Sequence, residues 1–133
     1  MMKKCCESVN PDLGIIIIRL ALAMVFIVHG LMKFQAMEKT IGFFGSLGFA
    51  PFFAYFVASV EFFGGILLLL GVFTSWTAIA LAFVMIFAIL LVKIGKPFAG
   101  GYEFELTLML VSLGLSLLGT GKYTVCPCRK SRK

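Results

Sequence analysis

Apolar residues fill four long stretches of this 133-residue chain, and polar residues are concentrated between and beyond them. The stretches are residues 13–34, 52–73, 76–92 and 104–118. An α-helix rises about 1.5 Å per residue, so about 20 apolar residues cross the hydrocarbon core of a bilayer. The last two stretches are shorter, and we expect Trp76, Lys93 and Tyr102 to carry their ends into the interface. The pattern predicts an all-α, four-helix transmembrane bundle.

The composition supports this prediction. Hydrophobic residues make up 61% of the chain and charged residues 14%, and the mean hydropathy is +1.07. A soluble domain of this length is far more polar. We therefore expect one membrane domain over residues 1–133, with basic tails at 1–11 and 122–133.

A cleaved signal peptide is the alternative for the first stretch. Lys3 and Lys4 precede it, and the Ala-Leu-Ala at 21–23 is similar to a cleavage site. However, Arg19 interrupts the apolar core of such a signal, and the apolar run continues past residue 23. We therefore expect a retained helix.

Four spans place both termini on the same side of the membrane. Seven basic residues fall on that side: Lys3, Lys4, Lys122, Arg129, Lys130, Arg132 and Lys133. The opposite loops carry Lys33, Lys39, Lys93 and Lys96. This excess predicts cytoplasmic termini, and it places much of the net charge of +6 near anionic headgroups. A nucleic-acid partner is not predicted, because no basic stripe is interleaved with exposed aromatic residues.

The connections between the stretches differ in length. The first, rich in glycine and phenylalanine at 42–49, is expected to lie along the interface or to fold partly back into the bundle. Pro51 suits the first turn of the second helix. A tight turn is predicted at Thr74 and Ser75, and breaks are predicted around Pro97 and Gly100.

Glu61 lies near the middle of the second stretch. An ionisable group there costs roughly 3 kcal/mol or more unless it faces protein or water and has a partner. Small residues share its side of the helix at three- and four-residue spacing: Ala54, Ala58, Gly64, Gly65 and Gly71. Since small residues allow close helix packing, we expect Glu61 to point into the bundle.

Arg19 is the expected partner of Glu61. Counted from the same surface, Arg19 is roughly 9 Å deep and Glu61 roughly 18 Å deep, and an arginine side chain covers most of that gap. Arginine binds a carboxylate through two parallel hydrogen bonds. Two interpretations stay open: the pair has a functional role, or it only fixes the register of the two helices.

His29 is the single histidine in the chain, one helical turn from Lys33. Its depth differs from that of Glu61 by roughly 7 Å, so a direct or water-mediated contact is feasible. One histidine cannot supply both axial ligands of a typical b-type haem. An unperturbed imidazole has a pKa of about 6.5, which suits proton exchange. The other interpretation is a histidine that is only hydrogen-bonded within the bundle.

The fourth stretch begins with Tyr102, Glu103 and Phe104, and its candidate for the bundle interior is Glu105. Glu105 shares a helix face with Ser112. Glu103 and the neighbouring lysines fit an ordinary charged rim where helices leave the membrane. The predicted polar core is therefore Glu61, His29, Arg19 and Glu105.

All four cysteines lie in the tails: Cys5, Cys6, Cys126 and Cys128. On a cytoplasmic face, reducing conditions disfavour a structural disulfide. The vicinal pair and the C-x-C pair are weak candidates for a soft-metal site, because their spacing does not match zinc patterns. Spare, solvent-exposed thiols are the other interpretation.

Several of these residues carry a family resemblance. The segments are 29–34 (His-Gly-Leu-Met-Lys-Phe), 60–65 (Val-Glu-Phe-Phe-Gly-Gly), 101–104 (Gly-Tyr-Glu-Phe) and 119–123 (Gly-Thr-Gly-Lys-Tyr). In this order and spacing they resemble the DoxX family, over about residues 12 to 124. The cysteine-bearing tails lie outside the resemblance.

The resemblance implies a small four-helix protein in the cytoplasmic membrane of a bacterium. The family is named for its likeness to a subunit of a thiosulfate:quinone oxidoreductase, so a redox role on quinones or thiols is implied, as an oxidoreductase or as a subunit of a redox complex. The chain shows no haem pair, no flavin or dinucleotide fingerprint and no iron–sulfur cysteine set. A quinone needs only an apolar cleft, a few hydrogen-bond donors and a proton carrier, so it is the cofactor that the sequence best accommodates.

Two other functions stay open at this stage. One is a non-catalytic scaffold that binds soluble redox enzymes through its basic tails. The other is a small-solute or proton transporter, for which four helices would require a homo-oligomer.

Overall fold

The helices of this chain follow its apolar stretches closely. The computed structural model describes residues 10–125. In chain order the elements are α1 (Pro11–Gln35), α2 (Met37–Ser46), α3 (Pro51–Leu70), α4 (Thr74–Ala88), the π-helical segments η1 (Ile89–Lys93) and η2 (Phe98–Tyr102), and α5 (Glu103–Leu118). Residues 10–125 contain no strand, so the all-α prediction is confirmed.

Within residues 10–125, four helical spans are long and apolar enough to cross a membrane. They are Pro11–Gln35, Pro51–Leu70, Thr74–Lys93 and Phe98–Leu118. Large apolar side chains such as Trp76 and Leu117 cover their outer surfaces. A surface of this kind suits lipid, because lipid chains are as apolar as these side chains. The chain is therefore a multi-pass membrane protein.

The turn between α3 and α4 differs from the sequence prediction. Pro51 begins α3 as expected, but α3 ends at Leu70 rather than at residue 73. Gly71 (φ 73°) and Phe73 (φ 48°) both adopt the left-handed conformation, which stops the helix. Thr74 then begins α4, so the turn predicted at residues 74–75 was wrong. Hydropathy does not show this end, because residues 72 and 73 are also apolar.

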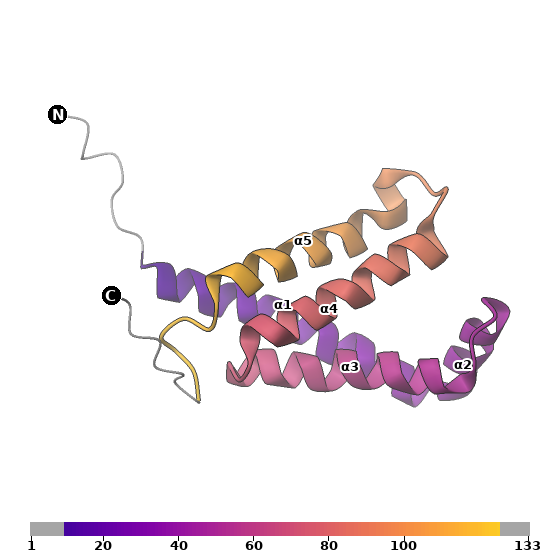
Figure 1. The fold of residues 1–133 in the computed structure, drawn as a ribbon, viewed down its shortest axis with the longest axis horizontal. Coiled ribbons are helices and arrows are strands. Elements are labelled where there is room, and N and C mark those ends of the chain that lie inside the picture. Colours follow the sequence, from indigo (N-terminus) through magenta and orange to yellow (C-terminus); the bar gives the residue numbers. More distant parts are fainter. Residues whose placement is uncertain (1–9, 126–133) are drawn as a thin grey trace.

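The bundle is built from two helix pairs. The α1 helix packs mainly on α3, and α4 packs mainly on α5. Figure 1 shows that α3 and α4 are close at their connecting turn and diverge toward the end where α2 lies. The buried core contains Leu22, Phe26, Leu68, Leu81 and Leu115.

Glycines set the α1–α3 contact. A Cβ atom added to Gly30 would lie 2.5 Å from the backbone nitrogen of Phe62. A Cβ atom added to Gly65 would lie 2.8 Å from the backbone nitrogen of Ile27. Because both contacts are to backbone atoms, they fix the axial position of α3 relative to α1.

The glycine-rich connection forms α2, which folds back toward the bundle. Thr40 Oγ1 donates to the carbonyl oxygens of Ala36, at 3.1 Å, and Lys33, at 3.3 Å, which joins α2 to the end of α1. From this position α2 contacts α3 and brings Phe43 and Phe44 to a cavity between the helices.

The two ends of the described chain lie at one end of the bundle. The backbone nitrogen of Lys122 donates to Asp12 Oδ1 at 3.1 Å, and that of Val125 donates to the carbonyl oxygen of Leu70 at 3.0 Å. An even number of spans requires this arrangement.

Candidate functional site

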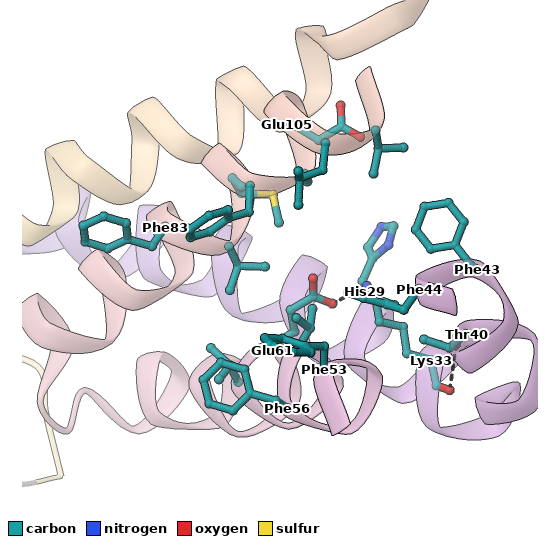
Figure 2. A pocket seen from close by; sticks show the side chains of 18 of the residues that line it. His29, Lys33, Thr40, Phe43, Phe44, Phe53, Phe56, Glu61, Phe83 and Glu105 are labelled. Atoms are coloured by element: carbon teal, nitrogen blue, oxygen red, sulfur yellow. Dashed lines mark hydrogen bonds and ion pairs between the residues drawn. The ribbon is translucent and has the colours of Figure 1, made fainter. Parts of the chain in front are cut away.

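A cavity of about 770 Å³ lies among α1, α2, α3, α4 and α5. Binding sites for small molecules have volumes of roughly 300–1,000 Å³. Most of its wall is aromatic or aliphatic, and the phenylalanines that line it are Phe26, Phe43, Phe44, Phe49, Phe53, Phe56, Phe83, Phe87 and Phe104. Figure 2 shows side chains from several helices converging on this space.

Six polar side chains interrupt the apolar lining: His29, Lys33, Lys39, Thr40, Glu61 and Glu105. Three of the four residues of the predicted polar core are therefore in the same cavity. Arg19 is the exception.

Glu61 forms an ion pair with Lys33. The distance from Lys33 Nζ to Glu61 Oε2 is 2.5 Å, and the exposed fractions of the two side chains are 27% and 4%. The prediction that Glu61 lies on a packed face is confirmed, since Ala54, Ala58 and Gly65 are buried beside it. In an apolar cavity the opposite charge of Lys33 offsets the cost of an ionised carboxylate.

Arg19 is not the partner of Glu61, so that prediction was wrong. Arg19 is 2% exposed and binds four backbone carbonyl oxygens. Its acceptors are Leu68 (3.0 Å), Leu69 (3.1 Å), Thr120 (3.0 Å) and Tyr123 (2.5 Å). The last carbonyls of a helix have no intrahelical partner, and a guanidinium group supplies several donors at once. Arg19 thus fastens the C-terminal segment to the end of α3.

The register of α1 and α3 explains the correction. Gly30 lies against Phe62, so Glu61 is level with about residue 30 of α1. Arg19 is level with the end of α3, and Leu68 follows Glu61 by seven residues, a rise of about 10 Å along the helix. Lys33 is the cation at the height of Glu61.

His29 lines the cavity beside this ion pair. Its ring centroid lies 5.7 Å from that of Phe104 on α5, with the ring planes tilted by 40°. Among the residues that the structure describes, His29 has no hydrogen-bond partner. Of the two contacts with Glu61 that the sequence left feasible, direct or water-mediated, the direct one is not formed. Both side chains nevertheless face the same space (Figure 2).

Glu105 forms a second ion pair on α5. Lys93 Nζ lies 3.3 Å from Glu105 Oε1 and donates to the carbonyl oxygen of Gly101 at 3.1 Å. The Glu105 side chain is 16% exposed. The prediction that Glu105 is an interior carboxylate rather than part of a rim therefore agrees with its position in the cavity wall.

Sequence reasoning missed the two lysines as ion-pair partners. Lys33 and Lys93 were counted among the basic residues of the loops opposite the termini. A signal was present for Lys33, because it lies one turn beyond His29 on the same face of α1. For Lys93 the pairing depends on the turn that reverses the chain between η1 and η2.

The cysteine predictions lie outside the described residues, since Cys5, Cys6, Cys126 and Cys128 precede residue 10 or follow residue 125. Within residues 10–125, no group of three or more metal-ligating side chains could hold a metal ion.

Two comparisons with known proteins found a match for this chain. Residues 14–94, more than half of the chain, match the family model described as DoxX. The chain is also 42% identical over 109 residues to "Putative oxidoreductase CatD" of Bacillus subtilis (strain 168), a match that covers 82% of this chain and 81% of that protein. No solved structure matches the chain.

Proposed function

Because this chain belongs to the DoxX family, we propose that it is a membrane oxidoreductase, or a subunit of a redox complex, that binds a quinone in the cavity beside Glu61. The observation that carries the proposal is a partly buried ion pair facing an aromatic-lined space of ligand size. The relative named as an oxidoreductase adds support for the reaction class.

The polar groups of the cavity suit a quinone ring. The Lys33 ammonium group is a donor for a quinone carbonyl, and the Glu61 carboxylate is an acceptor for the hydroxyl of the reduced form. Reduction of a quinone takes two electrons and two protons. In this proposal a redox partner supplies the electrons, and His29 exchanges protons with the bound ring, because a neutral imidazole has one nitrogen that accepts and one that donates.

The aromatic lining favours a quinone over a thiol as the substrate. Phenylalanine rings such as Phe44, Phe53 and Phe83 offer faces and edges on which a flat ring packs. A small thiol would gain little from such a wall.

We further propose that the protein lies in the plasma membrane of a bacterium, with both termini in the cytoplasm. The excess of basic residues in the terminal tails supports this orientation. The matched relative is a bacterial protein.

The test is a binding titration of the purified full chain in lipid nanodiscs. Analogues of menaquinone and ubiquinone are added to the wild type and to the Glu61→Gln and His29→Gln variants, with empty nanodiscs as the blank. We expect saturable binding that Glu61→Gln weakens, because the substitution removes the charge that holds Lys33 in place. Glu38→Gln, on the exposed side of α2, is the matched control and should bind as the wild type does.

Turnover is measured with the same variants when a reductant is supplied. His29→Gln should lower turnover more than binding, since proton exchange acts on the reaction rather than on affinity. The proposal fails if neither binding nor turnover depends on Glu61 or His29.

A further inference from the structure

The cavity beside Glu61 is open to its surroundings between α3 and α4. Four phenylalanines that line it are nevertheless between 42% and 58% exposed: Phe53, Phe56, Phe83 and Phe87. Figure 2 shows Phe56 of α3 and Phe83 of α4 on opposite sides of the space that Glu61 also faces. The opening therefore lies between the two helix pairs, where α3 and α4 diverge from their connecting turn (Figure 1).

This opening lies at the depth of the lipid chains. Phe56 belongs to the span Pro51–Leu70 and Phe83 to the span Thr74–Lys93. By the rise of a helix, they lie about 8 Å and about 15 Å inside the ends of those spans. A molecule that passes through the opening therefore comes from the hydrocarbon core of the membrane rather than from water.

A second hollow, which we call the α3–α4 groove, begins at the opening and has a volume of about 350 Å³. It shares Phe56, Val60 and Ala80 with the cavity. From there it extends along both helices to Leu67 and Thr77, toward the turn that joins α3 to α4. None of the described residues that line it is charged, and its polar side chains are two hydroxyls. The groove therefore suits a flexible apolar chain.

We propose that the ligand is a quinone with an isoprenoid tail, which enters from the lipid between α3 and α4 and keeps its tail in the α3–α4 groove. The inference rests on the proposed function, because it takes the quinone ring to lie beside Glu61. A tail on that ring leaves through the apolar opening, since the cavity wall at α2 carries the polar side chains of Lys39 and Thr40. Such a tail starts at the mouth of the groove, whereas a phospholipid chain starts at the membrane surface.

The experiment compares one quinone ring with and without a tail. Menadione (2-methyl-1,4-naphthoquinone) and the same ring with a geranylgeranyl tail are titrated separately into the full chain in nanodiscs. Each ligand is compared between protein variants, so that its partitioning into lipid cancels. Ser59→Trp fills the groove, because Ser59 lines the groove but not the cavity. Overpacking predicts that this variant binds the tailed quinone roughly tenfold more weakly than the wild type does, whereas menadione binds equally to both.

Ser116→Trp is the matched control. Ser116 of α5 is half-buried, as Ser59 is, and it lines neither the cavity nor the groove. This variant should bind both ligands as the wild type does. If it loses the tailed quinone as Ser59→Trp does, the effect is a general one of an added tryptophan and the inference is wrong.

Photolabelling tests the same placement on the wild type, which matters if Ser59→Trp does not fold. A diazirine in the tail of the geranylgeranyl quinone should label groove residues such as Phe63 and Leu67, and excess menadione should prevent the labelling by occupying the ring site.

Three results overturn this inference and, where menadione still binds saturably, leave the proposed function standing. One is labelling of the groove that persists under excess menadione, because the tail then behaves as a free lipid chain. Another is a groove without label, which is covered by something else, such as a second copy of this chain. The third is a Ser59→Trp variant that binds the tailed quinone as the wild type does, or that loses both ligands equally. A wild type that binds neither quinone overturns both proposals.

Discussion

The close crossing of α1 and α3 at Gly30 can be tested by adding one methyl group. In Gly30→Ala the new Cβ would lie 2.5 Å from the backbone nitrogen of Phe62 and 2.8 Å from its Cα. Favourable contacts between carbon atoms are at about 3.5–4.0 Å, so the helices must separate by about 1 Å. Neither atom belongs to a side chain that could rotate away.

The expected cost follows from two opposing contributions. Overpacking of this kind costs about 1–3 kcal/mol, and the contact with backbone places Gly30→Ala at the upper end of that range. Replacing glycine by alanine within a helix gains at most about 1 kcal/mol. We therefore expect the free energy of unfolding to fall by about 2 kcal/mol.

The assay is unfolding in mixed micelles, followed by far-UV circular dichroism as the fraction of denaturing detergent is raised. The control is Gly114→Ala on α5, where a new Cβ has no atom within 4 Å. That variant should be as stable as the wild type or up to about 1 kcal/mol more stable. The steric reasoning is refuted if Gly30→Ala matches the wild type, or if Gly114→Ala is destabilised to the same extent.

Three further predictions concern the polar residues and the topology. Arg19→Gln should lower the free energy of unfolding in the same assay by about 2–4 kcal/mol, because one amide group cannot donate to all four carbonyls. An unfolding transition like that of the wild type would contradict this. Lys33→Met and Glu61→Gln should each lower the free energy of unfolding. The double variant should lose less stability than the sum of the two single losses, with a coupling energy of about 1–3 kcal/mol. Additive losses would show that the ion pair contributes nothing to stability. If the termini are cytoplasmic, a green fluorescent protein fused to the C-terminus should fluoresce in a bacterial host, and an alkaline phosphatase fused there should be inactive. The opposite result would place the termini outside the cytoplasm.

The sequence predicted the helices well because a membrane span is a simple physical requirement. Each span needs about 20 apolar residues with satisfied backbone groups, and both properties can be seen in the residue pattern. The helix ends were less predictable. Gly71 and Phe73 stop α3 through their backbone conformation, and an apolar phenylalanine gives no sign of a left-handed φ angle. The helix α2 was also missed, since the glycine-rich connection was expected to lie along the interface or to fold partly back, with no helix assigned to it.

The sequence predicted residues of the candidate site but not the contacts between them. Helical periodicity places Glu61 on the face with the small residues, because that face follows from spacing along one helix. Its partner depends on the height of one helix against another. Arg19 was expected there because the prediction considered only charged partners. In the structure Arg19 binds backbone carbonyls. Every residue has a backbone carbonyl, so no sequence pattern identifies these acceptors.

The height of α3 against α1 links the packing of this protein to its chemistry. Gly30 and Gly65 allow the two helices to approach at one register only, since their contacts are with the backbone of the facing helix. That register brings Lys33, rather than Arg19, to Glu61 and leaves the ion pair in the wall of the cavity. A shift of one helical turn would move the ammonium group by about 5.4 Å and leave a carboxylate without its partner in an apolar space. Small residues without a polar side chain therefore determine which cation a ligand in the cavity meets. Ligand binding should weaken in Gly30→Ala even though no polar group has been changed.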